Sequence, residues 1–311
     1  MKRSMKTLTI IALGLTLVAG ACGKSNNNKK STTGTTTAAD LHPKITIGAQ
    51  DFGESAILAE IYKQGLAAKG YDVSIQKVGG FRDLEVKAFD SGTINFAPEY
   101  AASMLEFLNS KKGEASGDSK ATVNKLESYL LPKSLTVFNT SDAVDTNAFV
   151  VTKATADRLG LTTLSDLASK GAALRLGGPA DCETNPFCIP GLKSKYGVDF
   201  APKFKALETG QVATALDAGS IDVALLFSTD GRIKAKNYVL LTDDKKMLAA
   251  DNVVPVATVK LGLNKPLLAA TNAITKTLTT AALIDMNKRF DIDKEDAAVI
   301  AKDYLTTNHL I

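Results

Sequence analysis

The side chains of this 311-residue chain offer little for catalysis. Its only histidines, His42 and His309, lie near opposite ends of the sequence, so no Ser–His or Cys–His pair is indicated. The chain contains no G-x-S-x-G, H-E-x-x-H or Walker phosphate-loop motif. None of its 33 acidic residues forms an evident catalytic pair by spacing. We therefore expect a binding protein rather than an enzyme, with no cofactor and no metal.

Two cysteines lie close together in the segment DCETNPFC, at Cys182 and Cys188. In a chain outside the cytoplasm, an even pair at close spacing indicates a disulfide. A metal site is the alternative, but it needs three or four converging donors. We expect the disulfide.

Two segments of similar sequence end on an aromatic residue. They are DSGTINFAPEY at Asp90–Tyr100 and DAGSIDVALLF at Asp217–Phe227, 127 residues apart. A weaker echo precedes each, at Lys44–Gly48 and at Ala173–Gly177. A glycine after a helix, then a short apolar run, is typical of the entry to a buried parallel strand. Because ligands bind at the carboxyl ends of such strands, we expect two similar lobes with these aromatic residues at one cleft. Chance similarity is the alternative.

Strand and helix patterns alternate around these segments. This alternation predicts an α/β protein with largely parallel sheets. Pro255 suggests an edge position for the last strand. The expected strands are Ile45–Gly48, Tyr71–Val78, Ile94–Ala97, Leu135–Phe138, Ala148–Val151, Ile221–Leu226 and Asn252–Thr258. The expected helices are Glu54–Ala68, Arg82–Asp90, Glu99–Asn109, Ala121–Leu131, Gly210–Ala218 and Lys294–Leu305, the last with Asp293 as its N-cap.

The chain is expected to cross twice between the lobes, first near Asp142–Asn147 and again before Asn252–Thr258. Lobe I would then comprise residues 41–146 and 251–311, and lobe II residues 147–250. Two crossings form a hinge of two strands, which suits closure around a ligand.

The N-terminus indicates export. Residues 1–21 carry a basic start, a short apolar stretch and small residues before Cys22, which is the layout of a signal peptide. This segment resembles the bacterial lipoprotein signal, in which the cysteine becomes the lipidated mature N-terminus. Residues 22–40 would form a flexible tether. Six of the 37 basic residues but no acidic residue precede Asp40, which leaves 31 basic and 33 acidic residues, a net charge of −2. Nothing in this balance indicates nucleic-acid binding.

Four segments of the chain resemble the binding proteins of bacterial ABC importers for glycine betaine, carnitine and choline. They keep the order and spacing of that family, and PEY and STDGRI are their most specific parts. The segments are KITIGAQDFGESAILAEIY at Lys44–Tyr62, NFAPEY at Asn95–Tyr100, IPGLKSKYG at Ile189–Gly197 and LLFSTDGRI at Leu225–Ile233. The resemblance implies a two-lobed periplasmic-binding-protein-like fold of type II with the ligand in the interlobe cleft. It also implies a permease and an ATPase as partners, a monomeric chain, and a location outside the cytoplasm at the cell membrane.

In that family a quaternary ammonium ligand lies among aromatic rings, whose faces attract a cation that has no N–H to donate. Matched by position, Tyr100 and Phe227 stand at such places, and Asn147, Ser228 and Thr229 offer polar groups. Phe52, Phe81 and Phe187 are further candidate walls.

The chain also departs from the family pattern. Ala49-Gln50-Asp51 replaces a common Ser-Lys-Asn, so a Lys that would pair with a ligand carboxylate is missing. Gln50 and Asp51 are candidate ligand contacts, and Asp51 would face a cation or cap the next helix. Ile189 and Phe227 stand where the family often has tyrosines, and Ala101-Ala102-Ser103 replaces Thr-Gly-Thr. We predict binding of a quaternary ammonium osmoprotectant. The alternatives are another small amine, amino acid derivative or heterocycle and, more remotely, a lipoprotein enzyme.

Overall fold

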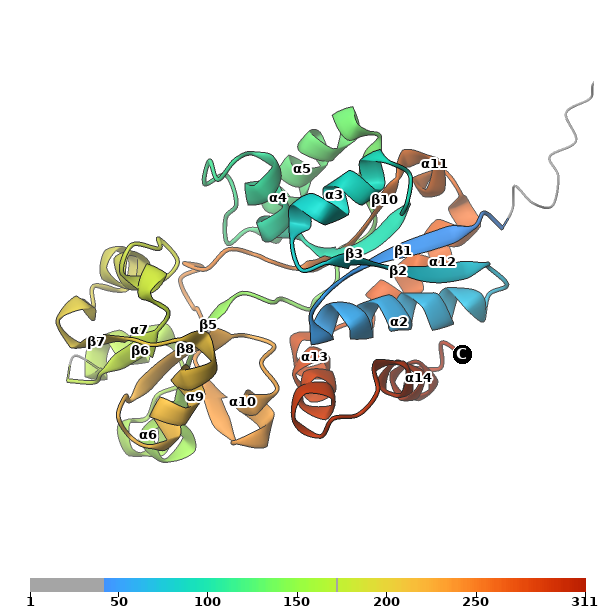
Figure 1. The fold of residues 1–311 in the computed structure, drawn as a ribbon. Helices are drawn as coiled ribbons and strands as arrows, with labels where there is room; N and C mark the ends of the chain where they lie inside the picture. The colour runs from blue at the N-terminus through green and yellow to red at the C-terminus, as the bar shows by residue number, and fades with distance from the viewer. Residues whose placement is uncertain (1–41, 172) are drawn as a thin grey trace, which may run out of the picture. The chain divides into compact units, whose positions relative to one another are not determined.

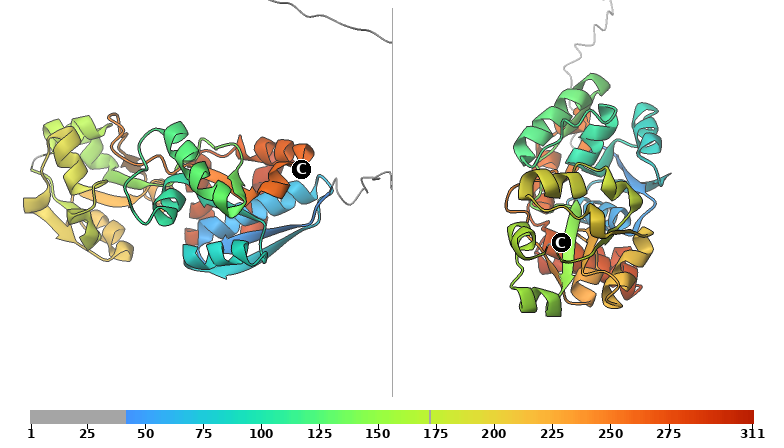
Figure 2. Two further views of the ribbon diagram at one scale, coloured as in Figure 1. Left: turned by 90° about the horizontal axis from the view of Figure 1, so that it is seen from above. Right: turned by 90° about the vertical axis from the view of Figure 1, so that its left-hand side faces the viewer.

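The computed structural model describes residues 42–171 and 173–311, which form two five-stranded sheets covered by helices (Figures 1 and 2). The expected signal peptide, Cys22 and the tether lie outside these residues. Within the described ranges, none of the helices combines the length and the apolar character needed to cross a membrane.

The first sheet has the strand order β2-β1-β3-β10-β4. β1 pairs in parallel with β2 and β3, whereas β10 pairs antiparallel with β3 and β4. Its strands are β1 (Ile45–Gln50), β2 (Val73–Gly79), β3 (Phe96–Tyr100), β4 (Leu135–Val137) and β10 (Val253–Thr258).

The second sheet repeats this topology with the order β7-β6-β8-β5-β9. β6 is parallel to β7 and β8, and β5 is antiparallel to β8 and β9. Its strands are β5 (Asn147–Thr152), β6 (Leu176–Gly178), β7 (Phe204–Ala206), β8 (Val223–Phe227) and β9 (Tyr238–Leu240). In each sheet four strands run in one direction and one strand runs in the opposite direction. This strand is β10 in the first sheet and β5 in the second, and by it the chain enters from the other sheet. Two similar α/β units are therefore present, as the paired segments predict.

Helices cover both faces of each sheet. Apolar side chains of α2 (Gly53–Ala67), α12 (Lys265–Thr275), α13 (Thr280–Asn287) and α14 (Ala297–Thr307) pack on one face of the first sheet. The other face packs against α3 (Arg82–Asp90), α4 (Ala101–Leu108) and α5 (Ser119–Leu130). In the second sheet, α6 (Lys153–Leu159) and α7 (Leu164–Lys170) pack on one face, and α9 (Thr209–Asp217) and α10 (Arg232–Ala235) pack on the other. Short elements complete the described residues: η1 (Leu131–Lys133), η2 (Ala180–Glu183), α8 (Ile189–Gly191), η3 (Leu192–Tyr196), η4 (Ala201–Lys203), α11 (Val259–Gly262) and η5 (Lys288–Ile292).

The two connections between the sheets pair with one another. Val144 and Asn252 form an antiparallel bridge, and the Asp145 amide donates to the Asp251 carbonyl at 3.0 Å. Each connection then enters its new sheet beside an aromatic residue, since Asn147 lies opposite Phe227 and Val253 opposite Tyr100. The limits proposed for the lobes at residues 146/147 and 250/251 stay predictions.

Three expectations about individual elements are wrong. Glu99 and Tyr100 belong to β3, so the next helix begins at Ala101; pairing with β10 holds these residues extended. Asp296 rather than Asp293 caps the C-terminal helix, and its carboxylate accepts from the Ala298 amide at 2.7 Å.

The expected edge position of Pro255 is the third error, because β10 is an interior strand. Pro255 lies opposite Pro98 on β3, and its carbonyl accepts from the Phe138 amide just beyond the last β4 pair, Val256 with Val137. The missing N–H therefore falls where the ladder with β4 has already ended, so an interior strand tolerates this proline.

Candidate functional site

A cavity of about 680 Å³ lies where β3 and β8 end, beside the paired connections. Residues of both sheets and of the C-terminal segment line it. They are Phe52, Gly53, Glu54, Arg82, Tyr100, Ser103, Asp145, Phe227, Thr229, Asp230, Arg232, Asp251, Asn287, Asp291 and Ile292.

Three aromatic rings contribute to this wall, and all three were expected from the sequence. Tyr100 is buried at the end of β3, and the ring of Phe52 lies 6.3 Å from it between centroids. Phe227 ends β8 on the other sheet and is 52% exposed, although it is a large apolar residue. A half-exposed ring at a cavity wall has a free face for a ligand.

A chain of hydrogen bonds joins the two sheets across the cavity. The Tyr100 hydroxyl donates to Glu54 Oε1 at 2.7 Å, and Asn287 Nδ2 donates both to Glu54 Oε2 and to the Thr229 carbonyl. The Thr229 hydroxyl donates to Asp145 Oδ1 at 2.8 Å. We call these five residues the bridging cluster. Glu54 and Asn287 come from elements packed on the first sheet, whereas Thr229 follows the last strand residue of β8.

Burial raises the pKa of the carboxyl groups in this cavity. The pKa of Glu54 rises chiefly through desolvation, against which the bonds from Tyr100 and Asn287 act. Desolvation and the nearby charge of Glu54 raise the pKa of Asp145 to about 8. Desolvation also raises the pKa of Asp251, whose oxygens accept hydrogen bonds from Ala102 and Ser103, to about 6. Ionised forms of these acids are thus costly until a positive charge arrives.

Both arginines of the cavity are already paired. Arg82 binds Glu99 through Nε and Nη2 at 2.7 and 2.9 Å, and Arg232 binds Asp230 in the same two-pronged way. The lining comprises five carboxyl groups and two guanidinium groups, so acids are in excess. Among the described residues, no three His, Cys, Asp or Glu side chains are grouped to hold a metal ion.

A smaller cavity of about 200 Å³ shares Ser103, Asp145, Phe227 and Asp251 with the larger one. Asn147 and Phe187, two further residues expected from the sequence, line it.

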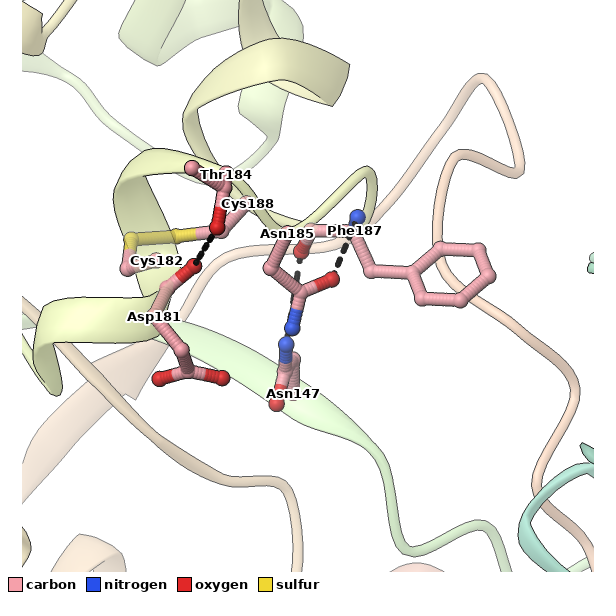
Figure 3. Close-up of a disulfide and its surroundings, with 7 residues drawn as sticks. All are labelled: Asn147, Asp181, Cys182, Thr184, Asn185, Phe187 and Cys188. Atoms are coloured by element: carbon pink, nitrogen blue, oxygen red, sulfur yellow. Dashed lines mark hydrogen bonds between the residues drawn. A yellow bond between two sulfur atoms is a disulfide. The ribbon is translucent and has the colours of Figure 1, made fainter. Parts of the chain in front are cut away.

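The disulfide loop builds this part of the wall (Figure 3). Cys182 and Cys188 are bonded, as predicted, and both are buried in the core of the second sheet. Asn185 Oδ1 accepts from the Phe187 amide at 2.9 Å, and Asn147 Nδ2 donates to the Phe187 carbonyl at 3.4 Å. The covalent ring therefore fixes the loop that carries Phe187 against the start of β5.

Four expected residues lie outside both cavity walls. Gln50 is buried behind Arg82, where its amide donates to Glu85 and Glu99. Ser228 is buried, and its hydroxyl donates to the Val144 carbonyl while accepting from the Thr146 amide, so it fastens the first connection. Asp51 and Phe81 are exposed, Phe81 by 73%.

Sequence reasoning missed the charged half of the site. Glu54 stands in the first turn of α2, Asn287 at the end of α13, and Asp145 and Asp251 on the two connections. The segment Asp142–Asn147 was identified as a crossing, and an acid at a crossing beside an aromatic strand end was the available clue. Nothing local in the sequence marks Asn287.

Comparison with known proteins gives consistent matches over the folded part. Residues 43–307 match the family described as the substrate binding domain of ABC-type glycine betaine transport systems. The chain is 26% identical over 278 residues to a glycine-betaine-binding protein of Pseudomonas aeruginosa, covering 86% of this chain and 88% of that protein. It is 27% identical over 270 residues to a carnitine transport binding protein of Listeria monocytogenes, covering 85% and 87%. A crystal structure described as a glycine betaine/carnitine/choline ABC transporter is similar, with a TM-score of 0.78, 27% identity, and coverage of 86% of this chain and 99% of that one.

Proposed function

The chain belongs to the family of substrate-binding domains of ABC-type glycine betaine transport systems, and from this premise we propose that its cavity captures a small quaternary ammonium solute. The likeness to solved members confirms the predicted two-lobed fold of the periplasmic-binding-protein type. Proteins of this family serve transport and act outside the cytoplasm. The captured solute would pass to a membrane permease driven by its ATPase.

One observation carries the proposal: rings from both sheets face a cavity with excess carboxyl groups. A trimethylammonium group has no N–H, so hydrogen-bond acceptors alone hold it poorly. The face of an aromatic ring attracts such a cation by about 2 kcal/mol when water is excluded. Phe52 and Tyr100 supply rings on one side and Phe227 on the other, and nearby acids supply the opposite charge.

The pairing of the two connections supports a hinge. They are joined to each other at Val144 and Asn252, while the bridging cluster joins the sheets at the cavity. Rotation about the paired connections would open the cavity, and a ligand held by rings from both sides would stabilise the closed form.

A different small amine is the second candidate, and the acids favour it specifically. A protonated amine with N–H groups would donate to Asp145 and Asp291, which line the cavity. We further propose that no catalysis occurs, that the chain is a monomer, and that lipid on Cys22 anchors it to the membrane. The sequence around Cys22 supports the anchor; replacing Cys22 by Ser should move the protein from the detergent phase to the aqueous phase in Triton X-114 partition.

Calorimetric titration of the chain from Asp40 onward tests the ligand class. We expect at least one of choline, glycine betaine and carnitine to bind with a dissociation constant below about 1 mM. If none does, and a small primary amine does, the quaternary ammonium proposal is wrong and the second candidate replaces it. A protein that binds neither class would contradict both.

A further inference from the structure

The charge inventory of the cavity points to one kind of quaternary ammonium solute. We propose that the site selects a net cation without a carboxylate, such as a trimethylammonium alcohol, and that Glu54 and Asp145 of the bridging cluster provide its counter-charge. This inference rests on the proposed function and narrows it from quaternary amines in general to those that lack a negative group.

A ligand carboxylate would find poor partners in this cavity. The two arginines on its wall, Arg82 and Arg232, each form a bidentate pair with a carboxylate of the chain itself. The partner of Arg82 is itself held in place, because Glu99 also accepts hydrogen bonds from the Gln50 side chain and from the Tyr100 amide. The charge of each guanidinium is thus already matched within the chain, so a ligand carboxylate would add a further negative charge to a cavity in which acids are in excess.

The five carboxyl groups on the cavity wall offer acceptor oxygens to a ligand when they are ionised. The amide hydrogens of Asn287 are already donated to Glu54 and Thr229. Asp145 receives a hydrogen bond at Oδ1 from Thr229. Acceptors suit a ligand hydroxyl and repel a ligand carboxylate, because a carboxylate can only accept.

The groups that face the Glu54–Asp145 pair are mostly acidic. Thr229 contacts both carboxyl groups, and Tyr100 on β3 donates to Glu54. Two further acids raise the pKa values of the pair: Asp251 on the second connection acts on Asp145, and Asp291 on η5 acts on Glu54. Cations lie one step further away. Arg82 lowers the pKa of Asp251, and Lys294 and Arg232 lower that of Asp291. A cation in the cavity would relieve the repulsion among these acids.

This arrangement gives the binding of a fixed cation a defined pH dependence. The Asp145 carboxyl has a raised pKa of about 8, so below that pH it holds a proton and attracts a cation weakly. Above it, the ionised carboxylate attracts the cation fully. The affinity for a permanent cation should therefore rise as pH increases from 6 to 9, with release of a proton to the solvent on binding below pH 8.

The test compares choline with glycine betaine, which share the trimethylammonium head and differ in the hydroxyl or carboxylate. Titrated at pH 8 on the chain from Asp40 onward, choline should bind at least tenfold tighter. Its dissociation constant should fall as pH rises. Titrations in buffers of different ionisation enthalpy should detect proton release at pH 7.

Asp145→Asn keeps the shape and the acceptor oxygen but removes the charge. It should weaken choline at least tenfold and abolish most of the pH dependence. It should weaken glycine betaine less, because the carboxylate of glycine betaine offsets its cationic charge. Asp142→Asn is the matched control, because Asp142 is exposed on the same connection and does not line either cavity described above. Glu54→Gln is an independent second variant in case Asp145→Asn impairs folding, which thermal unfolding would reveal.

The outcomes distinguish a failure of the cation inference from a failure of the proposed function. If glycine betaine binds as tightly as choline, or if choline binding is independent of pH, the cation inference is overturned while the proposed function stands. If no quaternary amine binds at all, the proposed function fails and the inference fails with it.

Discussion

A methyl group at Gly231 should prevent the two sheets from approaching as closely as they do. Gly231 precedes α10 on the second sheet, and a Cβ built there would lie 2.4 Å from the backbone nitrogen of Lys288 and 2.5 Å from its Cα. Gly231 has a φ of −58°, which alanine adopts without strain, so the collision is the only expected effect. Carbon atoms prefer separations of about 3.5 to 4.0 Å, so the backbones must move apart by roughly 1 Å.

The magnitude follows from the bonds beside the collision. Lys288 follows Asn287, which donates to the Thr229 carbonyl of the second sheet at 2.9 Å. A shift of this size breaks this neutral hydrogen bond, a loss of about 1 kcal/mol in the closed form. Ligand affinity should then fall about fivefold, since about 1.4 kcal/mol corresponds to tenfold.

Titration of Gly231→Ala with choline and glycine betaine measures this effect. Gly210→Ala is the matched control, because a Cβ at Gly210 meets nothing within 4 Å. Thermal unfolding of both variants should stay close to that of the unchanged protein, since neither residue lies in a core cluster. An affinity of Gly231→Ala within twofold of the control would refute the idea that close approach at α10 is required for binding.

Three further predictions concern the cavity wall at Tyr100, the buried carboxyl group of Glu85 and the disulfide loop. Tyr100→Ala should weaken the ligand at least tenfold, whereas Tyr100→Phe, which keeps the ring and loses only the bond to the Glu54 carboxylate, should cost less in the same titration. Burial and the nearby carboxylate of Glu99 raise the pKa of Glu85 to about 10. The folded protein therefore holds a proton that the unfolded chain releases, and stability is lost as pH rises from about 4.5 towards 10. Glu85→Gln should raise the melting temperature at pH 8 and leave it little changed at pH 4. Replacing Cys182 and Cys188 together by Ser should lower the free energy of unfolding in urea by roughly 2 kcal/mol, and an unchanged value would contradict a structural role for the ring.

The aromatic half of the site could be predicted because it follows from local sequence. A helix end, a glycine and a short apolar run place Tyr100 and Phe227 at the ends of β3 and β8, and the sheet topology is the same around both. Local patterns determine which residue ends a strand. They also determined the disulfide loop, because its two cysteines are only six positions apart in the sequence.

The charged half depends on contacts between distant parts of the chain. Asn287 reaches Glu54 across 233 residues of sequence, and Thr229 reaches Asp145 across 84. Each of these residues has an ordinary local explanation, such as a helix end or a loop acid, and its role appears only when both sheets are in place. The same reasoning explains the errors at Glu99 and Pro255, whose conformations are set by pairing between β3 and β10.

The location of the acids connects charge with the hinge. Asp145 and Asp251 lie on the two connections, their backbones are hydrogen-bonded to each other, and both side chains line the cavity. A cation that draws these two carboxylates towards itself therefore acts on the segments about which the sheets would rotate. Aromatic rings on the separate sheets give a ligand its closed-state contacts, while the acids on the connections let its charge bias the rotation. A neutral ligand of the same shape would keep the first effect and lose the second, so net charge should govern closure more strongly than size does.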